Sequence, residues 1–309
     1  MTPRCSRGHS LVELLVAMGL AAVVGAIVLP AMFSLQGHGL AEVHRNDLQA
    51  RAGRLLRFVS QDLRTAAFLV GANPRRTTGA APVLVHDSAP GNPAVALAHA
   101  LLAEDGGMHG NDALLLVKAE SFFPALRLAQ AAADGATTLR LDRRPNQAPG
   151  SSREILPAPE AISHVVLANQ RSCYPVGSAG QTLQLLDGLA AAAPIATELL
   201  GLRAHRFHLD RAGRLRRDDF TSDEILGDAV DGLQFEYLLA DGQIVDLPAE
   251  PGKVRAVRLS LLVRDQRPDR NYLDQAVYRL GNCSYGPYRD PFRRVVVSAM
   301  VEVKNHALP

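Results

Sequence analysis

GHSLVELLVAMGLAAVVGAIVLPAM, residues 8–32, is the stretch on which the rest of the chain depends. Glu13 is its only formal charge, and the 19 residues of Leu14–Met32 carry none. A helix needs about 20 such residues to cross a bilayer. Arg4 and Arg7 precede the run, so the positive-inside rule puts the N-terminus in the cytoplasm. The stretch therefore predicts a single-pass inner-membrane protein with a periplasmic globular part.

Two ordinary explanations do not account for every feature of this stretch. A secretory signal peptide needs a small-x-small cleavage site after its apolar run, and no clear Ala-x-Ala follows here. A plain signal anchor accounts for the apolar run and the basic flank but not for Glu13. An acid at full bilayer depth costs about 2.5–3.5 kcal/mol, so an intramembrane carboxylate indicates a functional site with a partner.

Gly8-His9-Ser10-Leu11-Val12-Glu13 resembles the type IV prepilin motif. The resemblance implies that a prepilin peptidase cuts between Gly8 and His9 and that His9 is then N-methylated. It also implies a salt bridge during assembly between Glu13 and the new α-amino group of a neighbouring subunit. The first mature residue of the family is usually phenylalanine, and His9 departs from that pattern. Pro30 could kink or loosen the apolar helix, as in many pilins, or could simply be tolerated in a membrane helix.

Beyond the membrane segment, apolar residues recur every three or four positions. This spacing predicts one face of an amphipathic helix. After Gly37 and Gly39, Asn46 or Asp47 could cap a new helical start. We accordingly divide the chain into a leader (1–8), a transmembrane or filament-core helix (9–36), an amphipathic helix (37–70) and a β-rich domain (71–309). The residues of the predicted apolar face are Leu48, Ala52, Leu55, Val59, Leu63 and Ala66.

After a turn-rich segment at 71–93, with perhaps one short strand, the pattern is mostly β. Alternating residues such as those of 254–264 need one covered face, and the helix is the natural cover. We expect an α+β, pilin-like fold with a long N-terminal helix on an antiparallel sheet and additional β-rich structure. Hairpin turns are predicted at 211–214 and at Asp241-Gly242. The predicted strands are 113–118, 137–141, 164–167, 202–209, 215–217, 233–238, 254–264, 276–280 and 293–304.

The order of these features resembles the PilW-type minor pilins, through the segments at 62–66, 111–117, 228–237, 254–264 and 293–298. The J-type minor pseudopilins of type II secretion share the layout. Either resemblance implies a low-abundance subunit that primes filament assembly at or near the tip. The implied partners are the prepilin peptidase, other minor pilins, the major pilin and, before assembly, the inner membrane. The protein would then move to the pilus at the cell surface.

The chain has three cysteines, and cleavage after Gly8 would remove Cys5. Cys173 and Cys283 would remain in an oxidising compartment, where disulfides form. Both lie in loop-like contexts with a neighbouring tyrosine, so we predict that they form a disulfide; the alternative is two separate thiols.

Other chemistry is weakly indicated. His205 and His208 lie three apart on a predicted strand and so point to opposite faces, and Asp241, Gly242 and Asp246 lack the acidic ladder of a calcium loop. We therefore expect no metal and no cofactor. G-x-S-x-G, P-loop, H-E-x-x-H and G-x-G-x-x-G motifs are absent, so an exported enzyme is disfavoured. The net charge of +2 demands no nucleic acid. The arginines of 203–217 could contact DNA or a surface ligand, although a solvated strand-hairpin face is the better explanation of them.

Overall fold

The computed structural model describes residues 11–66, 83–84, 95–96, 101–107, 110–142, 164–170, 172–179, 182–219 and 223–303. The chain divides into two compact units, residues 1–50 and residues 51–309. One helix, α1 (Leu11–Thr65), begins in the first unit and ends in the second. Almost all regular structure described after it is β.

Helix α1 is continuous over 55 residues. Its backbone stays helical through Pro30, Gly37 and Gly39, so the new helical start at Asn46 or Asp47 was a wrong prediction. Glycine inside a helix costs only about 1 kcal/mol, and an uninterrupted helix has no free N–H groups there to cap. No helix among the described residues is long and apolar enough to cross a membrane, and the side chains of residues 27–41 lie outside that description.

The predicted apolar face of the helix is confirmed by burial. All six of its members are at most 6% exposed. Within the second unit, Leu55 packs on Gly227, where an added Cβ would lie 2.7 Å from Leu55 Cδ2. Burying a leucine or valine stabilises the fold by about 1.5–3 kcal/mol. The part of this face within the second unit is therefore a main attachment of the helix to the β structure; its residues are Ala52, Leu55, Val59, Leu63 and Ala66.

Most strands of the second unit belong to two antiparallel sheets. The larger has nine strands, in the order β11-β10-β9-β6-β7-β8-β5, with β4 pairing with β9 and β3 with β4. Its strands are β3 (Leu101–Glu104), β4 (Ala113–Arg127), β5 (Thr138–Arg140), β6 (His164–Leu167), β7 (Cys173–Ala179), β8 (Thr182–Leu185), β9 (Glu198–Leu209), β10 (Leu215–Asp218) and β11 (Asp223–Gly227).

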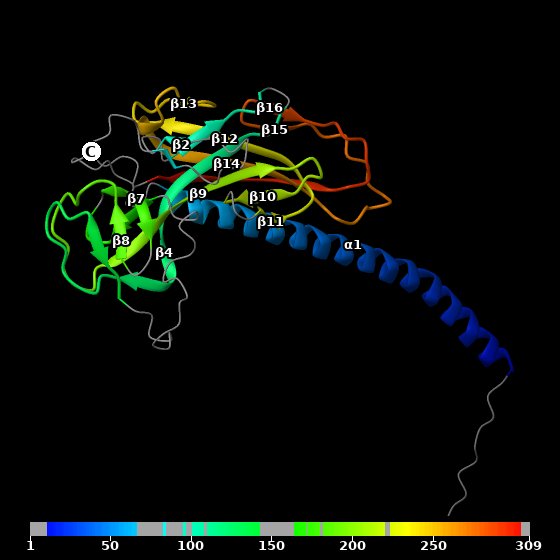
Figure 1. The fold of residues 1–309 in the computed structure, drawn as a ribbon. Coiled ribbons are helices and arrows are strands. Elements are labelled where there is room, and N and C mark those ends of the chain that lie inside the picture. The colour runs from blue at the N-terminus through cyan, green and yellow to red at the C-terminus, as the bar shows by residue number, and fades with distance from the viewer. Residues whose placement is uncertain are drawn as a thin grey trace, which may run out of the picture. The chain divides into compact units, whose positions relative to one another are not determined.

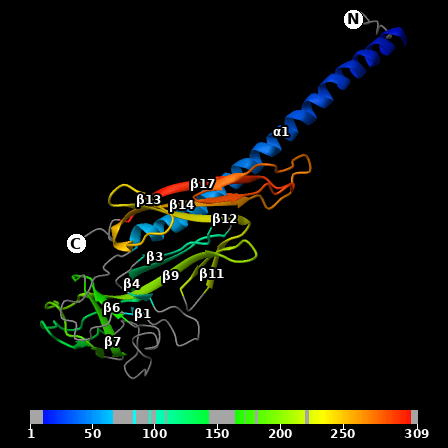
Figure 2. The same ribbon diagram turned by 90° about the horizontal axis from the view of Figure 1, so that it is seen from above.

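The smaller sheet has four strands in the order β13-β12-β14-β17. Figure 2 shows it as one layer, with β3, β4, β9 and β11 in another. The remaining strands form two-stranded ribbons, β1-β2 and β15-β16, and a short 3-10 helix, η2 (Pro251–Lys253), precedes β14. The bounds are β1 (Val83–Leu84), β2 (Val95–Ala96), β12 (Val230–Leu239), β13 (Ile244–Val245), β14 (Val254–Arg264), β15 (Tyr278–Leu280), β16 (Cys283–Tyr285) and β17 (Arg294–Glu302).

Strand β9 organises the larger sheet. Its C-terminal residues pair with β10, its N-terminal residues with β6, and β4 pairs along most of its length. Figure 1 shows β4 and β9 as two long neighbouring arrows. A separate apolar cluster packs around the buried Tyr174, in the part of this sheet formed by β5, β6, β7 and β8. The Tyr174 hydroxyl donates a hydrogen bond to Gln170 Oε1 and accepts one from Ala190 N.

The β part of the predicted fold is largely confirmed. The bounds of β6 and β14 agree with prediction, and the turns at 211–214 and Asp241-Gly242 both form, with positive φ at Gly213 and Gly242. β4 and β9 run longer than predicted. Several strands were not predicted, and most of them lie among glycine, proline, serine and charged residues that favour turns. They are β2, β3, β7, β8, β11, β13 and β16.

An ionic network links helix α1 to the larger sheet. Asp62 on the helix receives Lys118 Nζ at 2.6 Å and Arg217 Nη1 at 3.2 Å. Lys118 also lies 3.0 Å from Glu120 Oε1, which in turn lies 3.1 Å from His205 Nε2. The hydrogen bond with His205, and after it that with Lys118, lowers the pKa of Glu120 to about 2, against an opposing effect of burial.

A second link joins the two sheets. Asp112, at the start of β4, is 4% exposed and accepts Gly106 N at 3.0 Å and Phe235 N at 2.8 Å. The backbone of Asp112 donates to Leu233 O, and the side chain of Asn111 accepts from Leu233 N. Burial raises the pKa of Asp112 to about 6, although both N–H donors oppose the rise. The loop before β4 is thus fastened to the edge of β12.

We predict that Asp112→Ala lowers the free energy of unfolding by about 1–3 kcal/mol. It would leave the buried N–H of Phe235 without an acceptor, whereas Gly106, the other donor, is exposed and its N–H can bind water. Asp105→Ala, in the same loop but exposed, should cost less than about 1 kcal/mol. Urea unfolding of the detergent-solubilised full chain measures both. Equal stability of the two variants would contradict the role given to Asp112.

A second prediction concerns acid stability. Because the folded-state pKa of Glu120 is lowered, its contribution to stability is present above pH 4.5 and is lost as the pH falls towards about 2. The stability gap between wild type and Glu120→Gln should therefore narrow between pH 6 and pH 3 in urea unfolding. Glu250→Gln, which removes an exposed carboxylate, serves as the control. A gap that stays constant with pH would refute the assignment.

Candidate assembly site

The residues predicted at the N-terminus fall largely outside the described structure. Gly8 and His9 precede its first described residue. Glu13 and Pro30 are within the backbone of helix α1, but their side chains lie outside the description. Cleavage at Gly8, methylation of His9, the assembly salt bridge of Glu13 and the kink at Pro30 therefore stay predictions.

The basic cluster at 203–217 does not form a free cationic surface. Five of its six arginines pair with carboxylates: Arg203 with Glu120, Arg206 with Glu104, Arg214 with Asp210, Arg216 with Asp210 and Asp223, and Arg217 with Asp62 and Glu224. A carboxylate beside an arginine offsets its positive charge and so weakens its attraction for a phosphate. The structure therefore favours the strand-face interpretation of this cluster over DNA binding.

His205 and His208 do not form a shared metal site among the described residues. His205 is 4% exposed and its Nε2 contacts Glu120, whereas burial, as the largest effect, lowers the pKa of His208. Within the described residues, no three His, Cys, Asp or Glu side chains gather as a metal site would require. At Asp241 the carboxylate accepts Gln243 N at 3.0 Å, which is a turn contact.

The predicted disulfide is absent from the structure. Cys173 lies on β7 in an apolar cluster with Val166 and Leu200. Cys283 lies on β16, where its Sγ donates to Gly107 O at 3.0 Å. The two cysteines belong to different sheets, and each sulfur is packed in its own surroundings. The loop-like sequence contexts that suggested the bond are in fact two strands.

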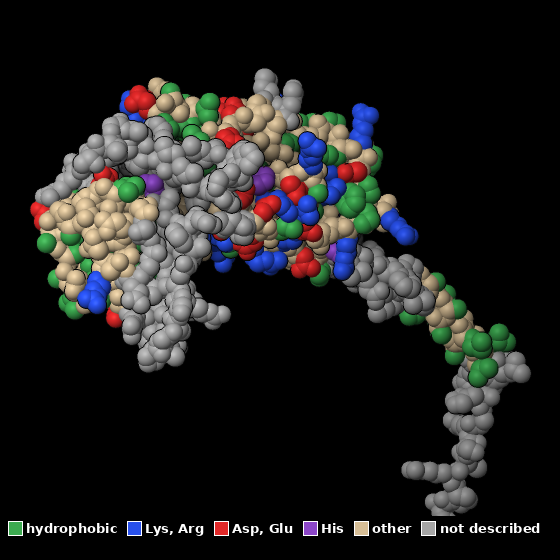
Figure 3. Space-filling view, viewed as in Figure 1, with side chains coloured by type: hydrophobic (Ala, Val, Ile, Leu, Met, Phe, Trp, Pro, Cys, Tyr) green, Lys and Arg blue, Asp and Glu red, His purple; other side chains and the backbone are tan. Residues whose placement is uncertain are grey.

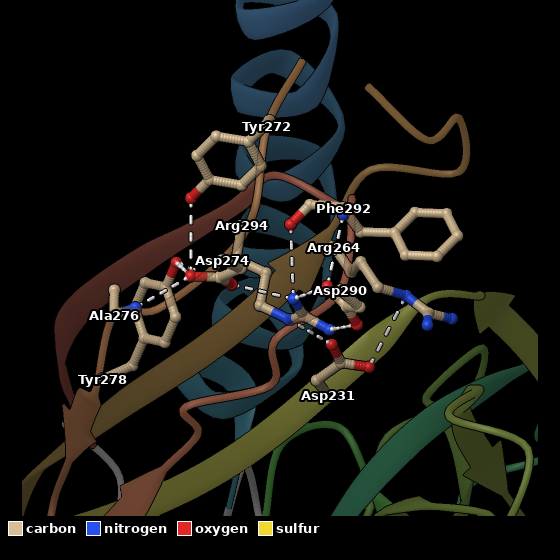
Figure 4. Close-up of polar contacts among 9 residues, drawn as sticks. All are labelled: Asp231, Arg264, Tyr272, Asp274, Ala276, Tyr278, Asp290, Phe292 and Arg294. Atoms are coloured by element: carbon tan, nitrogen blue, oxygen red, sulfur yellow. Dashed lines mark hydrogen bonds and ion pairs between the residues drawn. The ribbon is translucent and has the colours of Figure 1, made fainter. Parts of the chain in front are cut away.

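The most elaborate polar arrangement surrounds Arg294 at the start of β17. Its side chain is 1% exposed. Its guanidinium meets three carboxylates, with Nε 2.7 Å from Asp231, Nη1 2.8 Å from Asp274, and Nη1 and Nη2 each 2.7 Å from Asp290. The ring of Tyr288 lies 3.6 Å from the guanidinium carbon. Figure 4 shows the three carboxylates converging on this one cation.

Asp274 ties the arrangement to the chain around it. It is fully buried and accepts Tyr278 OH at 3.0 Å and Ala276 N at 3.1 Å, besides Arg294. Its backbone exchanges hydrogen bonds with Asp290 and Arg289. The hydrogen bond from Arg294 lowers the pKa of Asp290. These contacts fasten the long connection between β14 and β17, residues 265–293, which we call the arginine loop.

A buried ion cluster of this kind does not mainly add stability. Desolvation of the charges largely offsets their attraction, so the usual gain is one defined conformation. Here that conformation belongs to the arginine loop, because Asp274 and Asp290 come from the loop and Asp231 from β12. In the sequence, Arg293 and Arg294 stand out only as part of a predicted strand, and no local pattern indicates partners up to 63 residues away.

We predict that Arg294→Leu exposes the arginine loop to trypsin at Arg270, Arg279 and Arg289. Without this cation, three carboxylates lose their counter-charge, which lowers the free energy of unfolding by about 3–5 kcal/mol. Arg293→Leu is the matched control, because its pair with Asp269 is at the surface and contributes at most about 1 kcal/mol. Limited proteolysis with mass spectrometry compares the variants. Identical cleavage patterns for the two would show that Arg294 does not order the loop.

Two family descriptions match this chain. The prokaryotic N-terminal methylation motif matches residues 3–29, and the type IV pilus-assembly protein W family (PilW) matches residues 218–305. The second match covers the four-stranded sheet, the arginine loop and Arg294. Comparison with curated proteins and with solved structures finds no match.

The methylation motif implies processing by prepilin peptidase and a membrane-anchored, exported pilin, and pilins are structural proteins rather than enzymes. Together with the helix on antiparallel sheets, the two matches make the chain similar to the PilW family of type IV pilus-assembly proteins over residues 218–305, with a prokaryotic N-terminal methylation motif at residues 3–29.

Proposed function

We propose that this protein is a minor pilin that is cut between Gly8 and His9, N-methylated on His9, and then takes part in initiating pilus assembly at or near the tip. The observation that carries the proposal is the presence in one chain of a prepilin motif at residues 3–29 and a PilW match at residues 218–305. The 55-residue helix α1 begins three residues after Gly8 and ends in the unit that contains the PilW match.

In this proposal Glu13 acts in assembly. After cleavage, His9 carries a new α-amino group four residues before Glu13. Within an apolar bundle of helices, the Glu13 carboxylate of one subunit pairs with that cation on a neighbour. A charge left alone in such surroundings is strongly unfavourable, so the pair selects one axial register between subunits.

The alternative within the same architecture is a J-type pseudopilin of type II secretion. It would use the same leader, helix and Glu13 and differ only in the machine that it serves. Deletion followed by assays of surface pili and of protein secretion separates the two. Loss of pili with normal secretion supports the minor pilin, and the reverse pattern supports the pseudopilin.

We predict that the intact mass of the membrane-extracted protein lacks residues 1–8 and carries one added methyl group. In cells without prepilin peptidase, the mass should retain them. Glu13→Ala should be cleaved normally but fail to support pili, because the neighbour's amine loses its partner. Glu42→Ala, a carboxylate later in helix α1, is the control and should leave piliation intact.

Wild-type protein that keeps Met1–Gly8 in cells with active peptidase would refute processing. Normal piliation by Glu13→Ala would refute the assembly salt bridge while leaving cleavage untouched. The two parts of the proposal can therefore fail separately.

A further inference from the structure

The two ends of the four-stranded sheet differ in charge. Val230 of β12 pairs with Val263 at one end, and Leu239 pairs with Val254 at the other. The arginine loop leaves β14 and enters β17 at the first end, and the β12-β13 hairpin turns at the second. Ten residues of β12 separate the ends by about 33 Å.

At the first end, arginines hold three of the four acids of the arginine loop, and the fourth, Asp265, accepts the backbone N–H of Arg267. Asp274 and Asp290 are committed to Arg294, and Asp269 to Arg293. In the described part of the chain, four exposed arginines of the loop have no ion pair. Several Lys or Arg side chains accordingly stand out in Figure 3 where Figure 1 places this loop. Three of these unpaired cations, Arg267, Arg270 and Arg289, belong to this end; the fourth, Arg279, is on β15, whose turn at Gly281 approaches Glu236 in the middle of β12.

Apolar side chains lie among these cations. Leu273 is 53% exposed and Val277 is 55% exposed, each next to a residue fixed in the Arg294 cluster. Because that cluster already orders the loop, little further entropy is lost when a partner binds it. An ordered surface that mixes arginine with exposed aliphatic side chains is typical of a protein interface.

The other end of the sheet has the opposite composition. Asp105, Asp241 and Asp246 lie there, with Ile244 and Leu247 exposed beside them at 46% and 56%. The pKa of Asp246 is raised, first by burial and then by the Glu236 and Asp105 carboxylates, which indicates acids crowded together. We call this surface the acidic end.

Cations near the acidic end are largely compensated. Lys253 pairs with Glu250, and Arg258 pairs with Glu236. Arg255 is exposed and has no ion pair among the described residues, so it adds one positive charge against the three negative charges of Asp105, Asp241 and Asp246. The net charge of this end therefore stays negative.

We propose that the arginine loop of one copy docks on the acidic end of a second copy, head to tail. Each surface offers two exposed aliphatic side chains within charges of one sign, and the signs are opposite, so the two are complementary in both respects. Because the two surfaces lie at opposite ends of the sheet, a docked pair of copies still has one free arginine loop and one free acidic end. Such a heterologous contact continues from copy to copy instead of closing. It is separate from the assembly role of Glu13 and does not depend on it.

Nucleic acid is a less suitable occupant of the arginine loop. The loop contains no lysine, whereas both lysine and arginine serve phosphate contacts. Lysine is depleted and arginine enriched at protein interfaces. The matching aliphatic pair at the acidic end further favours a second copy of the chain.

Charge exchange on the detergent-solubilised full chain tests the contact. Arg267→Glu with Arg270→Glu reverses the arginine loop, and Asp241→Arg with Asp246→Arg reverses the acidic end. In sedimentation at low salt, wild type should self-associate, and each double variant alone should associate at least about tenfold more weakly. A mixture of the two should associate again, because each variant's loop then meets an end of the opposite charge on the other variant. The combined fourfold variant should regain association.

The control is Arg140→Glu with Arg211→Glu, which reverses two exposed arginines on the other sheet and should associate like wild type. Urea unfolding confirms that each variant is folded. Association unaffected by either double variant would assign it to helix α1 and overturn the proposal. Failure of the mixture to pair would also overturn it. A wild type that stays monomeric but binds duplex DNA through the arginine loop would replace it with nucleic-acid recognition.

Discussion

The second unit depends on keeping one row of helical side chains out of water. Ala52, Val59 and Leu63 are completely buried, and the sheet strands that cover them have their own apolar faces to bury. Neither layer is stable alone, because a single amphipathic helix and a one-sided sheet each expose an apolar face. The Asp62 network then fixes how the helix is seated, since its charges are satisfied only in one arrangement with Lys118 and Arg217.

Periodic features of this fold could be predicted from sequence. The helical face from Leu48 to Ala66 and the strand at 254–264 are visible because burial repeats along a short piece of chain. The new helical start at Asn46 or Asp47 was wrong because capping residues are also tolerated within a helix. Strands β7 and β16 were missed because Gly177, Pro175 and Ser284 favour turns, and only pairing with distant strands makes them β.

The polar centres could not be predicted, for a different reason. Lys118 lies 56 residues from Asp62, and Arg217 lies 155 residues from it, so no spacing rule connects them. The arginine cluster at 203–217 was visible as composition, but its neutralisation depends on acids such as Glu104 and Asp223 brought in by the fold. For the N-terminus the situation is reversed: Gly8 and Glu13 indicate function through local sequence alone.

The packing of the two cysteines has a consequence for their reactivity. Cys173 and Cys283 are 4% and 2% exposed and lie on separate strands, each within its own cluster. A thiol-modifying reagent therefore reaches either sulfur only when the strands around it open, and the rate of labelling at each position reports the opening of its own part of the fold.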